Sequence, residues 1–396
     1  MADKALRYIP ALDGIRGVAI IFVLAHHYGY VRFGWIGLQS FFVLSGFLIT
    51  SILLTEKNRR VGAYLGRFYW RRLLRTFPAY FGFLLVCGIL YLCITQPRGF
   101  LSELPSLATY WYNFTIVFPR HPLNRVFLHL WSMSVEEQFY LIWPFVVFAL
   151  DRANLRRIIV AIIVAIPLLR VAFFAYYHLH GAADAYAAST FYLATPFQLD
   201  AFATGAAIVL FRLMEWKIQP RWVFLASGCV LLLGLVNLSI GQDPFDAVRR
   251  AGGFEARLLS GFSFGYPLFL LQNRQFLWGY SIVNVFAAVL IISASQQNNL
   301  QKFFENRFLW YLGRISYGIY IVHWPIQVLL RPILPRNPWS VAGGIFFVIL
   351  FVITVGIAHL SYFYFEKRFL LMKDYFGKRR VGLMAPSDRE SLATPG

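Results

Sequence analysis

Residues 10–30 read Pro10-Ala-Leu-Asp13-Gly-Ile-Arg16-Gly-Val-Ala-Ile-Ile-Phe-Val-Leu-Ala-His26-His27-Tyr-Gly-Tyr30. Every residue between Arg16 and His26 is apolar or glycine, so the segment is suited to lie within a bilayer. An arginine near the centre of a membrane helix costs roughly 2.5–3.5 kcal/mol on insertion scales. The sequence therefore predicts a helix whose Arg16 faces a protein interior or a water-filled cavity.

Helical periodicity relates Arg16 to His27. At about 100° per residue, eleven steps bring the helix back to within ~20° of its starting direction, with a rise of ~16 Å. The spacing predicts a guanidinium and an imidazole on one inward face, which is a candidate reaction or transport site. Asp13, three residues before Arg16, can pair with it. The alternatives are an interfacial ion pair and a packed histidine, and His26 points about 100° away from His27.

The composition indicates an all-α, polytopic bundle of membrane helices. Of 396 residues, 59% are hydrophobic and 14% are charged, too few charges to cover a soluble protein of this size. The formal net charge is +19, but the basic residues lie between apolar runs, so membrane topology explains them and nucleic-acid binding is not expected. The three cysteines also lie in apolar runs and have no metal-ligand spacing.

Apolar segments and basic residues together predict about ten transmembrane helices with both termini cytoplasmic. With this topology, 25 Lys and Arg lie on inner segments and 10 on outer ones. The apolar patch at 261–271 is too short to cross. We expect a membrane domain over 1–370 and a basic, disordered cytoplasmic tail over 371–396. The expected spans are 14–30, 35–55, 77–95, 137–150, 157–177, 196–213, 222–240, 276–294, 309–331 and 340–363.

Arg72 and Arg75 lie three residues apart, just before Pro78 and the third expected span. On a helix that enters the membrane they form a guanidinium pair on one face. Because guanidinium groups match phosphate oxygens, a phosphorylated cytosolic donor could dock here. The alternative is that the pair only anchors the span on its inner side.

Polar residues in three further segments are candidates for a site. Ser45-Gly46 lets another helix approach closely, which needs no chemistry. Ser134 and Glu137 fit a helix capping box, which leaves Glu136 to orient a histidine or an arginine. In the ninth expected span, polar residues recur at helical spacing. The other candidates in these segments are Trp131, Ser132, Tyr140, Ser316, Tyr317, Tyr320 and His323.

Two short patterns do not support other chemistry. Gly261-Phe-Ser263-Phe-Gly265 matches the nucleophile motif of serine hydrolases, but that motif needs a strand-to-helix turn that a membrane bundle lacks. His178-x-His180 has no third ligand nearby in the sequence, so no metal site is expected.

Five motifs in register resemble the acyltransferase-3 family, membrane enzymes that move acyl groups onto glycans and other hydroxyl compounds. The resemblance extends from residue 10 to about 366. In two places the chain departs from the family pattern: Gln198 stands where relatives tend to have arginine, and Lys367-Arg368 follow Glu366 where a proline is common. The motifs are Leu12-Asp-Gly-Ile-Arg16-Gly with His27, Phe41-Phe-Val-Leu-Ser-Gly-Phe-Leu-Ile49, Arg72-x-x-Arg75, Trp131-Ser-Met-Ser-Val-Glu136-x-Gln-Phe-Tyr140 and Gly313-Arg-Ile-Ser-Tyr-Gly-Ile-Tyr320.

The resemblance implies a cytosolic acyl-CoA co-substrate, no bound cofactor and an O-acylated product, most commonly acetylated. His27 would be the general base or a transient acyl carrier, and Glu136 would orient it. Arg16 would stabilise charge on the thioester oxygen, or hold His27 and the donor in place. Arg72 and Arg75 would bind the donor phosphates. Since many relatives carry a further C-terminal domain, this chain resembles the stand-alone form.

The acceptor would be a glycan, a lipid-linked glycan or a small hydroxylated compound. The expected location is the lipid bilayer of a cell membrane, a bacterial inner or plasma membrane. A different class of function is open on the residues alone: a transporter or flippase with Arg16 and His27 as relay groups. The lack of a detectable repeat disfavours it, because many transporters are built from internal repeats.

Overall fold

The computed structural model describes residues 8–31, 33–94, 98–181, 184–240, 274–335 and 338–374, and these residues form helices and turns without a strand. This agrees with the predicted all-α class, because helices satisfy every backbone group within one segment. The helices are α1 Pro10–His27, α2 Ile36–Glu56, α3 Val61–Ile94, α4 Arg98–Ala108, α5 Tyr112–Val117, η1 Arg125–Leu130, α6 Trp131–Ala149, α7 Arg152–Leu179, α8 Asp184–Leu193, η2 Thr195–Gln198, α9 Leu199–Leu210, η3 Leu213–Glu215, α10 Pro220–Ile240, η5 Gln275–Leu277, α13 Gly279–Ala294, α14 Asn299–Phe304, α15 Arg307–Arg314, α16 Ser316–Leu330, η6 Arg331–Ile333, α17 Val341–Leu360, the π-helix η7 Ser361–Glu366, α18 Lys367–Leu370 and η8 Leu371–Asp374.

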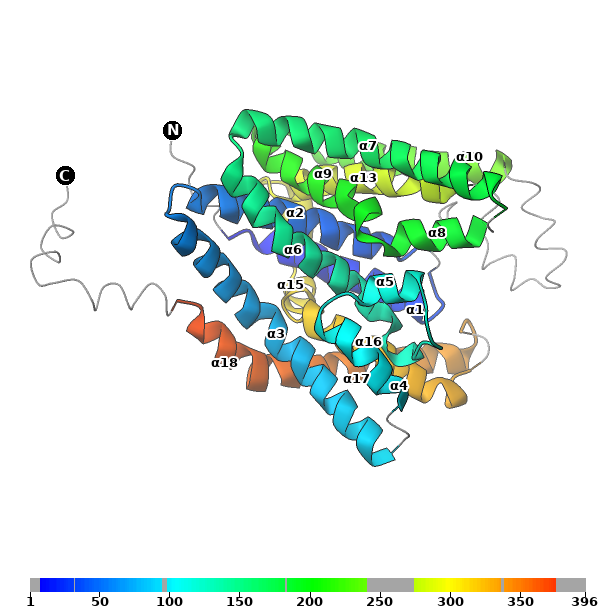
Figure 1. Ribbon diagram of the computed structural model, residues 1–396. Coiled ribbons are helices and arrows are strands. Elements are labelled where there is room, and N and C mark those ends of the chain that lie inside the picture. Colours follow the sequence, from blue (N-terminus) through cyan, green and yellow to red (C-terminus); the bar gives the residue numbers. More distant parts are fainter. Residues whose placement is uncertain are drawn as a thin grey trace, which may run out of the picture.

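The bundle is built around α1 and α2. In Figure 1, α7, α9, α10 and α13 lie together along one side, and α3 runs across the other side with α18 next to it. Helix α2 packs against α1, α6, α9 and α13, so its side chains are mostly buried. Many apolar side chains of α7, α10 and α17 are exposed, as expected for helices that face lipid.

Five described helices are long and apolar enough to cross a membrane, or six if a bent pair counts as one span. The others within the ten predicted ranges are shorter or more polar, so the count of ten and the orientation of the termini stay predictions. Residues 261–271, the hydrolase-like motif there and the end of the tail from residue 375 lie outside the described residues.

The close approach predicted at Ser45-Gly46 is confirmed. A Cβ atom on Gly46 would lie 2.0 Å from the carbonyl oxygen of Phe202 in α9, and one on Gly205 would lie 2.0 Å from the carbonyl of Val43. Helices α2 and α9 therefore pack backbone to backbone, which only small residues permit.

The capping box predicted at Ser134 and Glu137 is wrong. Helix α6 begins at Trp131, three residues before Ser134, so Ser134 lies inside its first turns. The 3₁₀ helix η1 leads directly into α6, and the Ser134 hydroxyl donates to the Leu130 carbonyl instead of capping. No free helix end is present at Ser134.

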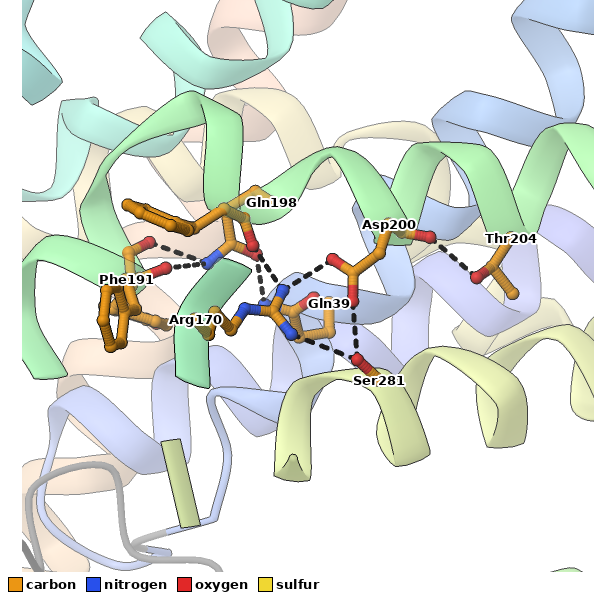
Figure 2. Close-up of polar contacts among 9 residues, drawn as sticks. Gln39, Arg170, Phe191, Gln198, Asp200, Thr204 and Ser281 are labelled. Carbon is orange, nitrogen blue, oxygen red and sulfur yellow. Dashed lines mark hydrogen bonds and ion pairs between the residues drawn. The ribbon is translucent and has the colours of Figure 1, made fainter. Parts of the chain in front are cut away.

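A sharp break separates α8 from α9, where the chain bends by 70°. Side chains satisfy the carbonyls at the break: Gln198 Nε2 donates to Phe191 and Tyr192, and Asn113 donates to Leu193. Figure 2 shows Arg170 of α7 beside this break, where it contacts the Phe197 carbonyl. A broken helix inside a membrane protein needs such donors.

Arg170 and Asp200 form a fully buried ion pair, with Nη2 and Oδ1 2.6 Å apart. Ser281 of α13 bridges the pair, since it accepts from Arg170 at 3.0 Å and donates to Asp200 at 2.7 Å. Gln39 of α2 donates to Gln198 at 2.8 Å (Figure 2). This network joins α2, α7, α9 and α13 at one level of the bundle.

Candidate functional site

Two cavities lie along α1. The first, near the beginning of the helix, has a volume of about 100 Å³ and is called here the arginine cavity. It collects most of the polar residues selected from the sequence. Its lining residues are Arg16, Leu38, Phe41, Phe42, Ser45, Leu48, Ile49, Arg72, Arg75, Thr76, Ser132, Met133, Glu136, Tyr140, Ser316, Tyr317 and Tyr320.

Three guanidinium groups give the arginine cavity its charge. Arg16 Nη1 lies 2.6 Å from Asp13 Oδ1, which confirms the predicted pair. Arg72 stacks over the Tyr140 ring at 3.6 Å, and neither its guanidinium nor that of Arg75 forms a hydrogen bond or ion pair with a described residue. Both belong to the continuous helix α3, as predicted. Two guanidinium groups without a hydrogen-bond or ion-pair partner in the part of the chain that the structure describes favour an anionic ligand.

Glu136 is the carboxylate of the arginine cavity. It accepts hydrogen bonds from the Ser45 hydroxyl and, at 2.6 Å, from the Tyr140 hydroxyl. The structure therefore does not bring Glu136 to His27, and the predicted pairing of the two is wrong. The reason is the position of His27 along the helix axis: it lies at the other end of α1 and lines a different cavity.

The second cavity lies near the end of α1, has a volume of about 490 Å³ and is called here the histidine cavity. It contains His27, but Arg16 does not line it. Aromatic and histidine rings form most of its wall. Its lining residues are Val23, His26, His27, Trp35, Leu38, Ile116, Leu128, His129, Trp131, Ser189, Tyr192, Leu193, Tyr320 and Trp324.

His27 is oriented by His323, which is completely buried in α16. His323 Nδ1 lies 2.6 Å from the Tyr320 carbonyl oxygen, and since a carbonyl only accepts, Nδ1 carries a proton. A neutral His323 can then only accept at Nε2, which lies 2.8 Å from His27 Nδ1. His27 Nδ1 is therefore the donor, and its Nε2 is left with an unshared electron pair.

The other two histidines of the cavity have structural hydrogen bonds. His26 Nδ1 donates to the Val31 carbonyl at 3.1 Å, beyond the end of α1. His129 Nε2 donates to the Ile321 carbonyl at 3.0 Å, and its ring stands edge-on to His323. Both contacts hold the surroundings of His27 in place.

Tyr320 and Leu38 line both cavities and so form the partition between them. The Tyr320 hydroxyl donates to the His129 carbonyl at 2.8 Å and is 2.6 Å from Ser132 Oγ. Because its single proton is used on the carbonyl, Ser132 donates to it. Tyr320 of α16 is thus held in the partition by hydrogen bonds with η1 and α6.

The remaining predicted residues are divided between the two cavities. Ser316 donates to the Gly313 carbonyl at 2.8 Å and Tyr317 to the Thr76 carbonyl at 2.9 Å, and both line the arginine cavity. Trp131 lines the histidine cavity. Among the described residues, no group of three His, Cys, Asp or Glu side chains is placed to hold a metal ion.

Sequence analysis did not assign a role to several residues of the histidine cavity. His129 lies two residues before the motif that begins at Trp131. Tyr320 was selected from the polar spacing of the ninth expected span, but without a role of its own. Trp35, Tyr192 and Trp324 carry no such signal, since an aromatic residue in an apolar run is usually ordinary packing.

Comparison with known proteins matches this chain to acyltransferases. A family model described as an acyltransferase domain matches residues 9–362. The peptidoglycan O-acetyltransferase OatA of Listeria monocytogenes is 28% identical over 91% of this chain and 55% of its own length. The O-acetyltransferase OatA of Staphylococcus aureus is 27% identical over 91% of this chain and 57% of its own length. The chain thus spans about half the length of these relatives, and no solved structure matches it significantly.

Proposed function

This chain belongs to the acyltransferase family whose domain covers residues 9–362, and from this we propose that it transfers an acetyl group from acetyl-CoA to a hydroxyl group of a glycan. The names of the matched relatives, which are O-acetyltransferases and in one case act on peptidoglycan, support a sugar hydroxyl as the acceptor. The observation that carries the proposal is the unshared Nε2 of His27 in a cavity separated from the arginine cavity by Tyr320 and Leu38.

The donor binds at the arginine cavity. Arg72 and Arg75 contact the phosphates of coenzyme A, because guanidinium groups form paired, charge-assisted hydrogen bonds with phosphate oxygens. The cavity itself is narrow, about 100 Å³, and so suits the thioester arm, with the nucleotide outside it. Arg16 then lies on the path between the phosphates and the partition.

The acceptor hydroxyl binds next to His27. Nε2 of His27 takes the hydroxyl proton while the hydroxyl oxygen attacks the thioester carbonyl at the partition. Arg16, which lines the arginine cavity only, holds the donor in place, and the coenzyme A thiolate leaves and takes up a proton from the imidazolium. Direct transfer is one route; the other is a transient acyl group on His27 Nε2, which the acceptor hydroxyl then removes.

Transfer of labelled acetyl from acetyl-CoA to a saccharide, measured with purified protein in nanodiscs, tests this proposal. We expect a label in the ester fraction that depends on both substrates. Movement of an unmodified polar substrate across sealed vesicles, with no labelled ester, would instead favour a transporter.

We propose that the chain crosses the membrane about ten times with both termini in the cytoplasm, which places the arginine cavity toward the cytosol and the histidine cavity toward the outside. The excess of Lys and Arg on the predicted inner segments supports this orientation. It also gives a cytosolic thioester access to Arg72 and Arg75.

Reporter fusions test this topology. A reporter after Gly396 should be active only as a cytoplasmic fusion, because the tail carries Lys378-Arg-Arg380. A reporter within residues 240–256 should be active only outside. Tail activity confined to the outside would mean that residues 261–271 cross the membrane and that the count is eleven.

Replacing Arg72 and Arg75 together with Gln should raise the KM for acetyl-CoA at least about tenfold, because each lost charge-assisted hydrogen bond is worth roughly 1.5–3 kcal/mol. Loss of uniform binding raises KM more than it lowers kcat. The matched control is Arg60→Gln with Arg67→Gln, which removes two nearby charges that do not line the cavity. Equal donor KM values for the two double variants would assign Arg72 and Arg75 to topology alone.

A further inference from the structure

The wall of the histidine cavity is aromatic and carries no carboxylate, lysine or arginine among the described residues that line it. The rings of Trp131 and Tyr192 have centroids 4.5 Å apart and planes tilted by 55°, so they form two adjoining sides of one aromatic surface. Trp35 and Trp324 also line the cavity, and Trp324 packs edge-on against His27 at 4.9 Å. The base and the aromatic surface therefore share one space.

We propose that this surface, defined by Trp131 and Tyr192, binds a neutral pyranose ring of the acceptor with the reacting hydroxyl directed to His27. The faces of aromatic rings carry negative charge in their quadrupole and attract the weakly positive C–H groups of a sugar ring. The inference rests on the proposed function and adds the acceptor class and the residues that select it.

Hydrogen-bonding groups at the same surface suit sugar hydroxyls. Within the described residues, neither the Tyr192 hydroxyl nor the Trp131 indole nitrogen forms a hydrogen bond, although both residues line the cavity. A ligand with several hydroxyl groups can satisfy them, whereas an alkyl chain cannot. An anionic ring would lose its hydration without meeting a cation on this wall, which is costly.

The polar network of Figure 2 holds this surface in place. Gln198 binds the carbonyl of Tyr192 at 2.9 Å, directly at the break after α8. The guanidinium of Arg170 lies 5.1 Å from the ring of Tyr280, which is stacked against Tyr192 at 6.1 Å. The Tyr192 ring is thus fixed before a ligand arrives, which lowers the entropic cost of binding.

The cavity volume agrees with this ligand. About 490 Å³ lies within the range of roughly 300–1,000 Å³ that is usual for small-molecule sites. The arginine cavity, at about 100 Å³, is too narrow for a sugar ring and carries three guanidinium groups. The charge and size of the two cavities therefore direct the anionic donor to the arginine cavity and the neutral sugar to the histidine cavity.

Saturation-transfer difference NMR with N,N′-diacetylchitobiose, a neutral disaccharide, tests the proposal on the full chain in nanodiscs. On irradiation of aromatic protons, we expect saturation of the sugar ring C–H protons in the unsubstituted protein and a weaker, still measurable saturation in His27→Ala, which lacks the contact with the reacting hydroxyl but keeps the aromatic surface. Trp131→Leu and Tyr192→Leu should each reduce the signal at least fivefold, whereas Tyr192→Phe, which keeps the ring, should retain most of it. Phe224→Leu is the matched control, because Phe224 is 71% exposed on α10.

Undiminished signals in both leucine variants would overturn the proposal, and so would an equal signal from the anionic sugar N-acetylneuraminic acid. A copurified lipid that is released from Trp131→Leu, with no sugar signal in the unsubstituted protein, would overturn it as well. Absence of acetyl transfer by the unsubstituted protein in the labelling assay, with its sugar signal intact, would argue against the proposed function and leave the binding surface supported, so the two proposals fail separately.

Discussion

His27→Ala is expected to abolish acyl transfer at unchanged membrane expression. Loss of a general base typically lowers the rate 10²–10⁴-fold, more than a packing change in a folded protein would. In the histidine cavity, the imidazole of His27 donates through Nδ1 to the buried His323, which leaves its Nε2 unshared. If His27 instead carries the acyl group, the loss should be at least as large.

His26→Ala is the matched control and should keep most of the activity. His26 also lines the cavity, but its Nδ1 is used on the Val31 carbonyl. His323→Ala, measured in parallel, should lower kcat and shift its pH dependence, because His27 would lose the acceptor that fixes its tautomer. Initial rates at matched expression compare the three variants. Full activity in His27→Ala, or equal losses in the two neighbouring histidine variants, would contradict the assignment.

Helical periodicity predicted which face of α1 a side chain lies on better than which site along the helix it belongs to. The pairing of Asp13 with Arg16 follows from a spacing of three and is confirmed. The same reasoning placed Arg16 and His27 in one site, yet they line separate cavities, because eleven residues rise about 16 Å along the axis. Two residues on the same face of a helix therefore need not belong to the same site.

The partners of the two key groups could not be predicted from one sequence. His323 lies 296 positions from His27, and Ser45 lies 91 positions from Glu136. Such contacts depend on how distant helices pack, which local patterns do not encode. The motifs themselves were informative, since Ser45, Glu136 and Tyr140 were selected separately and meet in the arginine cavity.

Gln198 illustrates a departure from a family pattern that the structure explains. It looked like the loss of an arginine at the start of a span. In the structure its amide donates to two carbonyls at the break and accepts from Gln39, and Arg170 from another helix supplies the guanidinium nearby. The break lies between Leu193 and Thr195, just before the span predicted over 196–213, and the sequence did not predict that α8 precedes this span at an angle.

Asp200→Leu and Arg170→Met are each expected to destabilise the protein by roughly 3–5 kcal/mol, because each leaves the other charge buried without its partner. Both side chains are almost fully buried, and Ser281 is shared between them. For the double variant we expect little change in the free energy of unfolding. Replacing both members of a buried ion pair with apolar residues of similar size is often close to neutral.

The double-mutant cycle therefore distinguishes two cases. In the first, the Arg170–Asp200 ion pair stabilises the fold relative to two apolar residues. In the second, the protein is destabilised only when one charge is left without its partner. Heating purified protein in detergent, followed by size-exclusion chromatography, gives the midpoint of unfolding for all four proteins. We expect low midpoints for the two single variants and a midpoint near the unsubstituted protein for the double variant. Because the network also fixes Tyr192, the double variant should bind the neutral disaccharide more weakly even where its stability is restored. Additive losses in the double variant would show that Arg170 and Asp200 act independently, and would remove the ion pair as the support of the break between α8 and α9.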